Sequence, residues 1–133
     1  MADVAVVIVN YNSGAFLKQC LVGLRQSTIP LEIVVVDNGS IDGSAEFLGK
    51  ANGVSDCRLI RNSANQGFAV AVNQGVQSTT SEDVLLLNPD CIVQPHSIAM
   101  LKLAMQREEC GAAGGLVFGF DGREQAGCRR RDP

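Results

Sequence analysis

The stretch DVLLLNPDCIVQP, from Asp83 to Pro95, contains the pattern that decides the fold. Its four consecutive apolar residues, 84–87, are typical of a strand that is buried on both faces of a sheet. The run stops at Asn88-Pro89-Asp90, and apolar residues resume directly afterwards. Strands of this kind occur mainly in parallel sheets that helices cover on each side.

Similar apolar runs recur along the chain and alternate with segments of helical periodicity. The expected strands cover residues 4–9, 32–36, 57–60, 83–87 and 113–118. The expected helices cover residues 15–26 and 67–77, a short helix capped by Ser40 or Asp42, and a helix that begins at Pro95 and ends at Gly111, before a turn at Asp121-Gly122. Within 67–77, the residues expected to face the sheet are Phe68, Ala71, Val72 and Val76. The alternation predicts an α/β fold of three layers, a mostly parallel sheet with helices on both faces.

Composition indicates a single folded domain over residues 1–133. Hydrophobic residues make up 46% of the chain and charged residues 19%, which favours a packed core over disorder. The formal net charge of −3 argues against a nucleic-acid partner. We expect neither a membrane-spanning segment nor a signal peptide. The five cysteines are widely spaced and form no CxxC pair, which indicates reduced thiols in a cytoplasmic protein rather than a zinc site or disulfides.

Polar residues follow each of the first four expected strands. In open parallel sheets, ligands bind outside the carboxyl ends of the strands. The segments in question are Asn10-Tyr11-Asn12, Asp37-Asn38-Gly39-Ser40, Arg61-Asn62 with Asn65-Gln66-Gly67 further on, and Asn88-Pro89-Asp90. They should lie along one edge of the sheet, and their side chains suit ribose, base edges and phosphate.

Two common phosphate-binding motifs are absent from the sequence. It has no GxxxxGK[ST], which argues against a P-loop NTPase. It has no GxGxxG after the first strand, which argues against a dinucleotide-binding loop of the Rossmann type. Asp37 suits a ribose hydroxyl or a base N–H group, although an Asx turn or a helix cap explains it equally well. Asp90 suits a divalent metal, Mg²⁺ or Mn²⁺, bound to a diphosphate, although position alone favours an ordinary turn aspartate.

Four segments in a fixed order add a stronger signal. They are VVIVNYN (6–12), VVVDNGSIDGS (34–44), NSANQGFAVAVNQG (62–75) and LLLNPD (85–90). Each segment alone is weak, but the ordered set closely resembles the inverting family 2 glycosyltransferases with the GT-A fold, and among them the rhamnosyltransferase-like branch. The resemblance extends from Val4 to about Gly127.

The resemblance implies roles for particular residues. The nucleotide sugar is expected to contact Asn10, Tyr11, Asn12, Asp37, Asn38, Asn65, Gly67, Phe68, Asn73 and Asn88. The family's metal motif, usually DxD, is here Asn88-Pro89-Asp90, so Asp90 is the expected metal ligand. Since an amide replaces the first carboxylate, the metal should depend more on the phosphates of the nucleotide.

The implied activity is transfer of a sugar, with inversion, from a dTDP- or UDP-linked donor to a hydroxyl of a saccharide or lipid-linked saccharide. Such enzymes serve cell-surface polysaccharide or glycolipid synthesis, in the cytoplasm or peripherally at the inner membrane face. The family's general base lies downstream of the metal motif, where the candidates are Asp121, Glu124 and Asp132. Because Asp121 fits a hairpin turn, we leave the catalytic residue unassigned and expect a donor-binding half, truncated before the acceptor half.

Two other classes of function fit parts of the sequence. A non-catalytic nucleotide-sugar-binding module would share the same site and would differ from the enzyme in having no transfer activity. A receiver-like regulatory domain would need acidic residues after the first strand, where this chain has Asn10 and Asn12. The second of these hypotheses is therefore disfavoured.

Overall fold

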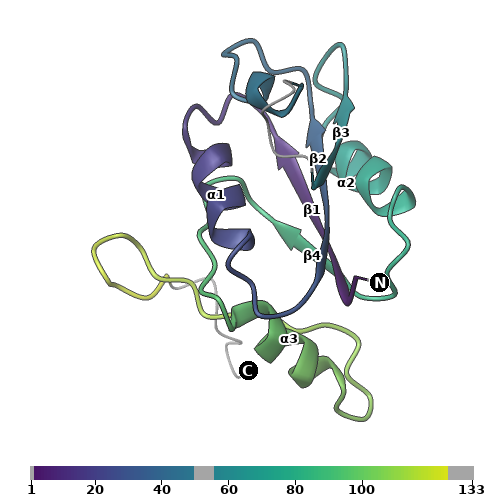
Figure 1. The fold of residues 1–133 in the computed structure, drawn as a ribbon, viewed down its shortest axis with the longest axis vertical. Coiled ribbons are helices and arrows are strands. Elements are labelled where there is room, and N and C mark those ends of the chain that lie inside the picture. Colours follow the sequence, from purple (N-terminus) through teal and green to yellow (C-terminus); the bar gives the residue numbers. More distant parts are fainter. Residues whose placement is uncertain (1, 50–55, 126–133) are drawn as a thin grey trace, which may run out of the picture.

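The computed structural model describes residues 2–49 and 56–125, and within them four strands form one parallel sheet. The strands are β1 (Val4–Asn10), β2 (Leu31–Asp37), β3 (Cys57–Arg61) and β4 (Val84–Leu87), in the order β3-β2-β1-β4 (Figure 1). The helices are α1 (Phe16–Leu24), α2 (Phe68–Gln77), α3 (Ser97–Met105) and a short 3-10 helix, η1 (Glu46–Gly49). The predicted order of strands and helices is confirmed as far as α3.

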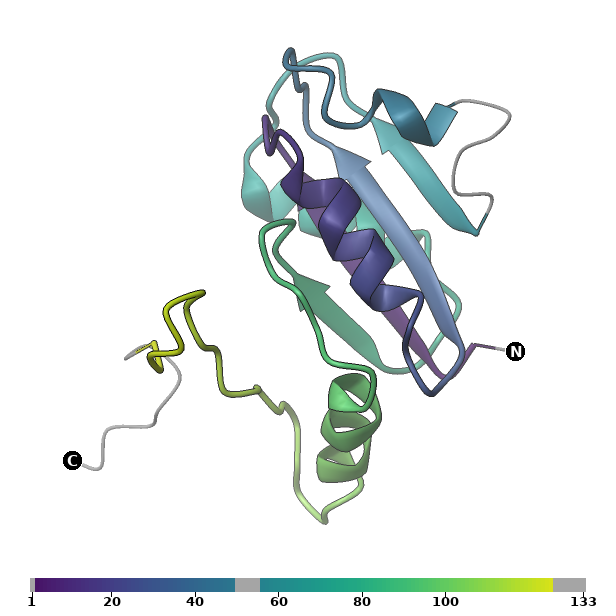
Figure 2. The ribbon, with the colours of Figure 1, turned by 60° about the vertical axis from the view of Figure 1, so that its left-hand side comes forward.

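Helices α1 and α2 cover opposite faces of the sheet, which confirms the predicted three-layer α/β fold (Figure 2). Successive side chains of a strand point to opposite faces, so each strand contributes to both cores. The core on the α1 side includes Val6, Ile8, Leu17, Cys20, Leu21, Leu24, Val35 and Ile98. The core on the α2 side is formed by Val7, Val34, Val36 and Ala71.

Helix α2 lies unusually close to the sheet. Its buried residues Ala71 and Gly75 are one turn apart, and a Cβ atom added to Gly75 would lie 2.3 Å from Val7 Cγ1. This contact fixes the rotation of the helix, so Phe68 is 59% exposed and Val76 is exposed as well. The expectation that Phe68 and Val76 face the sheet is therefore wrong.

Strand β4 differs from the prediction of burial on both faces. It is an edge strand in the described part of the chain, paired with β1, and α2 packs over β1 and β2. Leu85 and Leu87 pack against the α1-side core, whereas Leu86, on the other face, is 51% exposed. The apolar run predicted the strand correctly but not its place at the edge of the sheet.

The chain after β4 also departs from expectation. Helix α3 begins at Ser97, two residues after Pro95, and ends at Met105 rather than near Gly111. The strand expected at 113–118 is wrong, because residues 111–125 form only an isolated bridge between Phe118 and Glu124 around the predicted Asp121-Gly122 turn. In both views this segment stands away from the sheet, so its backbone has no neighbouring strand to pair with (Figures 1 and 2). Among the helices of residues 2–49 and 56–125, none has the length and apolarity needed to cross a membrane.

Replacing Gly75 with alanine should destabilise the fold. The added methyl group overlaps Val7, which costs about 1–3 kcal/mol, whereas helix propensity alone would favour alanine by roughly 1 kcal/mol. Urea unfolding followed by circular dichroism measures the difference. Gly114→Ala is the control, since no atom lies within 4 Å of its added Cβ. A Gly75→Ala variant at least as stable as the wild type would contradict this packing.

The described cysteines, Cys20, Cys57, Cys91 and Cys110, are free thiols, and Cys20 is fully buried on the sheet-facing side of α1. Burial, followed by the nearby Cys91 and Asp90, raises the pKa of Cys20 to about 12 from its ordinary value of 9.0. At neutral pH the Cys20 thiol is therefore protonated and serves as a core side chain.

Stability should consequently fall above pH 9. Between that pH and about 12, the unfolded chain ionises Cys20 while the folded chain keeps it protonated, so the free energy of unfolding drops by about 1.4 kcal/mol per pH unit at most. The free energy of unfolding is measured by urea unfolding at several pH values between 8 and 11 and plotted against pH. The slope of this plot should be shallower for Cys20→Ala than for the wild type. Val22→Ala, at an exposed position of α1 that carries no ionisable group, should keep the wild-type dependence of stability on pH. Equal slopes in all three proteins would refute the assignment.

Candidate functional site

Strands β1, β2 and β3 end side by side, and their last residues are in register. Asn10 pairs with Asp37 across the sheet, and Asp37 pairs with Arg61. Residues in register project to the same face, so three polar side chains lie next to one another at the carboxyl edge. The loops after these strands and after β4 meet this edge, as predicted from the parallel topology.

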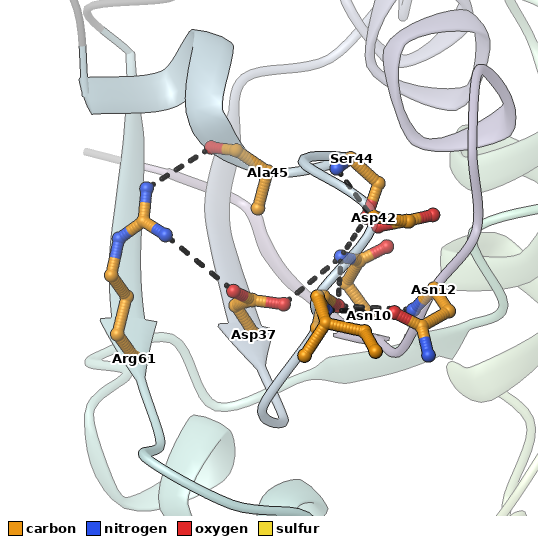
Figure 3. Close-up of polar contacts among 9 residues, drawn as sticks. Asn10, Asn12, Asp37, Asp42, Ser44, Ala45 and Arg61 are labelled. Carbon is orange, nitrogen blue, oxygen red and sulfur yellow. Dashed lines mark hydrogen bonds and ion pairs between the residues drawn. The ribbon is translucent and has the colours of Figure 1, made fainter.

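Asn10 is fully buried, and its side chain joins β1 to the loop after β2 (Figure 3). Its amide nitrogen donates to Asp37 Oδ1 at 3.1 Å, Ser40 Oγ at 3.1 Å and Ser44 Oγ at 2.9 Å. Its amide oxygen accepts a hydrogen bond from the Ser13 hydroxyl. The polar atoms of Asn10 are thus engaged within the protein, so it positions Asp37. Its predicted direct contact with a nucleotide stays a prediction.

Asp37 is a buried residue, 4% exposed, and its carboxylate lies between an amide and a cation. Oδ1 accepts from Asn10, and Oδ2 lies 3.5 Å from Nη1 of Arg61 (Figure 3). A carboxylate oxygen has two lone-pair directions, so each oxygen keeps some acceptor capacity. Arg61 also donates from Nη2 to the carbonyl oxygen of Ala45 at 3.3 Å, which holds its guanidinium beside Asp37.

The loop after β1 is fixed against the loop after β2 through Asn12, whose backbone has a φ of +48°. The backbone N–H of Asn12 donates to Ser40 Oγ at 3.0 Å, and its side-chain oxygen accepts from the N–H of Ile41 at 2.9 Å. Asp42 Oδ2 accepts from the N–H of Gly14 at 2.9 Å. Hydrogen bonds from Ser44, then from Gly14, hold the pKa of the Asp42 carboxyl below its usual range. Asn12 and Asp42 therefore hold the loop that carries Tyr11 against the loop after β2.

Asn38 fixes the loop before α2 in the same way. Its amide nitrogen donates to Asn65 Oδ1 at 3.0 Å and to the carbonyl of Gly67 at 3.3 Å. Its amide oxygen accepts from Asn62 Nδ2 and from the N–H of Gln66, both at 3.0 Å. Asn38 is buried, so it holds the Asn65–Gly67 segment in place at the sheet edge.

The remaining predicted residues are exposed and available to a ligand. Tyr11 and Phe68 expose about half or more of their side chains, and Asn73 lies on the outer surface of α2. Asn88 and Asp90, after β4, are exposed as well. The structure therefore joins six of the predicted residues through hydrogen bonds, namely Asn10, Asn12, Asp37, Asn38, Asn65 and Gly67. Tyr11, Phe68, Asn73, Asn88 and Asp90 lie outside this network.

Comparison with known proteins assigns this arrangement to a family. The model of the family described as "Glycosyl transferase family 2" matches residues 5–131. The chain belongs to this family. It is 29% identical over 123 residues to the glycosyltransferase GlyG of Streptococcus pneumoniae, a match that covers 89% of this chain and 40% of GlyG. The family 2 domain described here thus spans less than half the length of that relative.

Solved structures support the same fold. The mannosyltransferase PcManGT of Pyrobaculum calidifontis, in complex with GDP-Man and Mn²⁺, aligns with a TM-score of 0.72 at 22% identity, covering 80% of this chain and 33% of that one. TarS 1-349 of S. aureus, in complex with UDP-GlcNAc, aligns with a TM-score of 0.68 at 20% identity, covering 77% of this chain and 31% of that one. The predicted GT-A architecture is confirmed.

The segment after β4 carries the carboxylate expected to bind a divalent metal, Asp90. The described residues contain no cluster of three or more His, Cys, Asp or Glu side chains that could hold a metal ion by themselves. Asp90 is exposed, and its carboxylate makes no hydrogen bond or ion pair with any described residue. One free carboxylate beside the Asn88 amide fits a Mg²⁺ or Mn²⁺ ion that takes its other ligands from substrate phosphates.

The sequence did not single out Arg61 and Ser44 as site residues, although Arg61 contacts Asp37 and Ser44 accepts from Asn10. The signals that could have identified them are the position of Arg61 at the carboxyl end of β3 and that of Ser44 inside DNGSIDGS (37–44). Among the candidate general bases, Asp121 pairs with Arg123 and accepts from its backbone N–H, as a turn residue does. Asp132 lies outside the described residues.

Replacing Asn10 with alanine should destabilise this family 2 domain by about 2–4 kcal/mol, because Asp37 and the serines lose a buried donor. Urea unfolding measures the change, and Gln77→Ala on the exposed side of α2 is the control. If Asn10→Ala matched the control, the side chain would not be the structural link described here.

Proposed function

We propose that this chain binds the nucleotide-diphosphate sugar donor of a family 2 glycosyltransferase that transfers a sugar to an acceptor hydroxyl with inversion. One observation carries the proposal: at the carboxyl edge of the sheet Asn10 bonds Asp37, Asn38 bonds Asn65, and the backbone N–H of Asn38 joins the two pairs by donating to the carbonyl of Asn10. Around these residues lie the exposed Tyr11 and Asp90. Buried residues fix the loops at this edge, and exposed residues are free to touch the donor.

Different residues of the chain would contact different parts of the donor. Tyr11 offers an exposed ring on which a base can stack. The Asp37 carboxylate offers an acceptor to a ribose hydroxyl or a base N–H group. Asp90, with Asn88, would hold a divalent metal whose chemistry is to stabilise the charge that develops on the leaving diphosphate.

The narrower parts of the proposal rest on the motif and on relatives. Asn88 in place of a carboxylate supports the rhamnosyltransferase-like branch and a dTDP- or UDP-linked donor. The structural neighbours were solved with GDP-Man and UDP-GlcNAc, so donors of this class are the ones to test. We also propose a role in cell-surface polysaccharide or glycolipid synthesis, with a saccharide or lipid-linked acceptor, at a cytoplasmic location that includes the inner membrane face.

A non-catalytic nucleotide-sugar-binding module is the second candidate. It is favoured by the surroundings of Asp121, the first acidic residue after Glu109. The Asp121 carboxylate is engaged with Arg123 in a turn, so it is not free to act as a general base. The two functions differ in turnover. Chromatography would detect turnover. If this chain released free sugar from a nucleotide sugar, or transferred the sugar to an acceptor, the binding-module function would be rejected.

Loss of Asp90 should weaken metal-dependent nucleotide binding. Calorimetric titration with dTDP, UDP and GDP, with and without Mn²⁺, should show binding that Mn²⁺ strengthens. Asp90→Ala should reduce the affinity in Mn²⁺ by about tenfold, on the order of 1.4 kcal/mol, and should leave the metal-free affinity unchanged.

Glu82→Ala is the matched control, since this exposed carboxylate lies near the other end of β4. Equal binding by Asp90→Ala and the wild type would remove the metal-ligand role alone. Absence of any metal-dependent nucleotide binding by the wild type would overturn the proposed function.

A further inference from the structure

Arg61 is part of the candidate site, yet neither the motif nor donor binding as proposed above gives it a role. We propose that Arg61 is a specificity-determining residue that recognises a carbonyl oxygen of the donor's base. Together with Asp37 it would select nucleotides whose base carries a ring N–H group beside a carbonyl group: uracil, thymine or guanine. The inference rests on the proposed function, because it requires the nucleotide to lie at this edge of the sheet.

The position of Arg61 is fixed by the sheet and by two contacts. It is in register with Asp37, so the two side chains leave neighbouring strands on the same face. Nη1 lies 3.5 Å from Asp37 Oδ2, and Nη2 donates to the Ala45 carbonyl at 3.3 Å (Figure 3). The planar guanidinium is therefore oriented from both sides.

Arg61 nevertheless keeps donors for a ligand. A guanidinium carries five N–H groups, and the two contacts with Asp37 and Ala45 use only part of them. The side chain of Arg61 is 49% exposed, whereas that of Asp37 is 6% exposed. Donors of Arg61 are thus open to solvent next to a nearly buried acceptor.

This pair is complementary to one kind of base edge. An acceptor next to a donor matches a ring N–H group next to a carbonyl oxygen, which uracil, thymine and guanine provide. Cytosine and adenine present a bare ring nitrogen to the carboxylate and an amino group to the guanidinium, and both contacts are unfavourable. Asp37 alone would accept equally well from an amino group of cytosine, so the discrimination depends on Arg61.

Charge supports the same arrangement. A nearly buried, unpaired carboxylate would repel the negative diphosphate of a donor, and Asp42 and Asp90 already add negative charge to the loops of this edge. The Arg61 guanidinium neutralises Asp37 without removing its remaining acceptor capacity. The base subsite can therefore keep a carboxylate next to an anionic ligand.

The test compares nucleotides that share ribose and diphosphate but differ in the base edge. The full chain is titrated calorimetrically in Mn²⁺ with the pairs UDP–CDP and GDP–ADP, and with pyrophosphate. In the pair that contains the tightest-bound nucleotide, the wild type should prefer the base with the ring N–H by about tenfold or more. In Arg61→Met, which keeps the length of the side chain, that preference should fall to within about twofold, while Mn²⁺–pyrophosphate binding stays unchanged.

Arg58→Met is the matched control, because Arg58 lies on the same strand and also faces a carboxylate of β2, Glu32, at 3.7 Å. It sits towards the other end of β3 and should keep the wild-type preference. A preference that survives in Arg61→Met, or equal weakening of both members of a pair, would overturn base recognition by Arg61. Wild-type binding of nucleotides without any preference would do the same.

A second probe needs no variant and covers the case in which Arg61→Met unfolds. The wild type should bind 4-thio-UDP several-fold more weakly than UDP, since sulfur is a poorer acceptor than the carbonyl oxygen. Equal binding of the two would overturn the inference if UDP is the preferred pyrimidine nucleotide, and 6-thio-GDP replaces it if GDP is preferred. Failure of every nucleotide and of pyrophosphate to bind would instead overturn the proposed function.

Discussion

The buried hydrogen bond between the Asn10 amide and the Asp37 carboxylate is the interaction on which the rest of the site depends. A buried carboxylate needs partners, and Asn10 supplies one from the neighbouring strand at 3.1 Å. The same amide group bonds Ser40 and Ser44, so the loop after β2 is built around the end of β1. Parallel pairing makes this possible, because it brings both strand ends to the same edge.

From this link the site acquires a division between fixed and free residues. Asn10 and Asn38 are buried and use their amide groups on the protein itself, so they act on a ligand through the loops that they hold. Tyr11, Phe68 and Asp90 are exposed and carry the surface that a ligand meets. Rigid support beneath exposed contacts keeps the geometry of a site while leaving its binding groups open.

The sequence predicted the structure best in the central strands of the sheet. Strands β1 and β2 are buried on both faces, so their apolar runs predicted them closely. It was least informative where burial depends on what lies alongside: Leu86 has the same apolar character as Val34, but an edge position leaves it exposed. The run at 113–118 failed for a related reason, since apolar residues form a strand only beside a partner. In the site, polarity after each strand located the edge, but it could not separate Asn10, which supports Asp37, from residues that face solvent.

The charges at this edge explain why a metal and an arginine have separate tasks. Arg61 contacts Asp37 and the Ala45 carbonyl, so its positive charge mainly neutralises a buried carboxylate beside the base subsite. A diphosphate bound further along the edge, beside Asp90, gains little from that cation, because charges in water are screened within roughly 10 Å. The exposed carboxylate of Asp90 adds repulsion unless a divalent cation lies between it and the phosphates. With one carboxylate rather than two, the ion would take most of its ligands from the phosphates of the nucleotide. The metal and the donor should therefore bind this domain cooperatively.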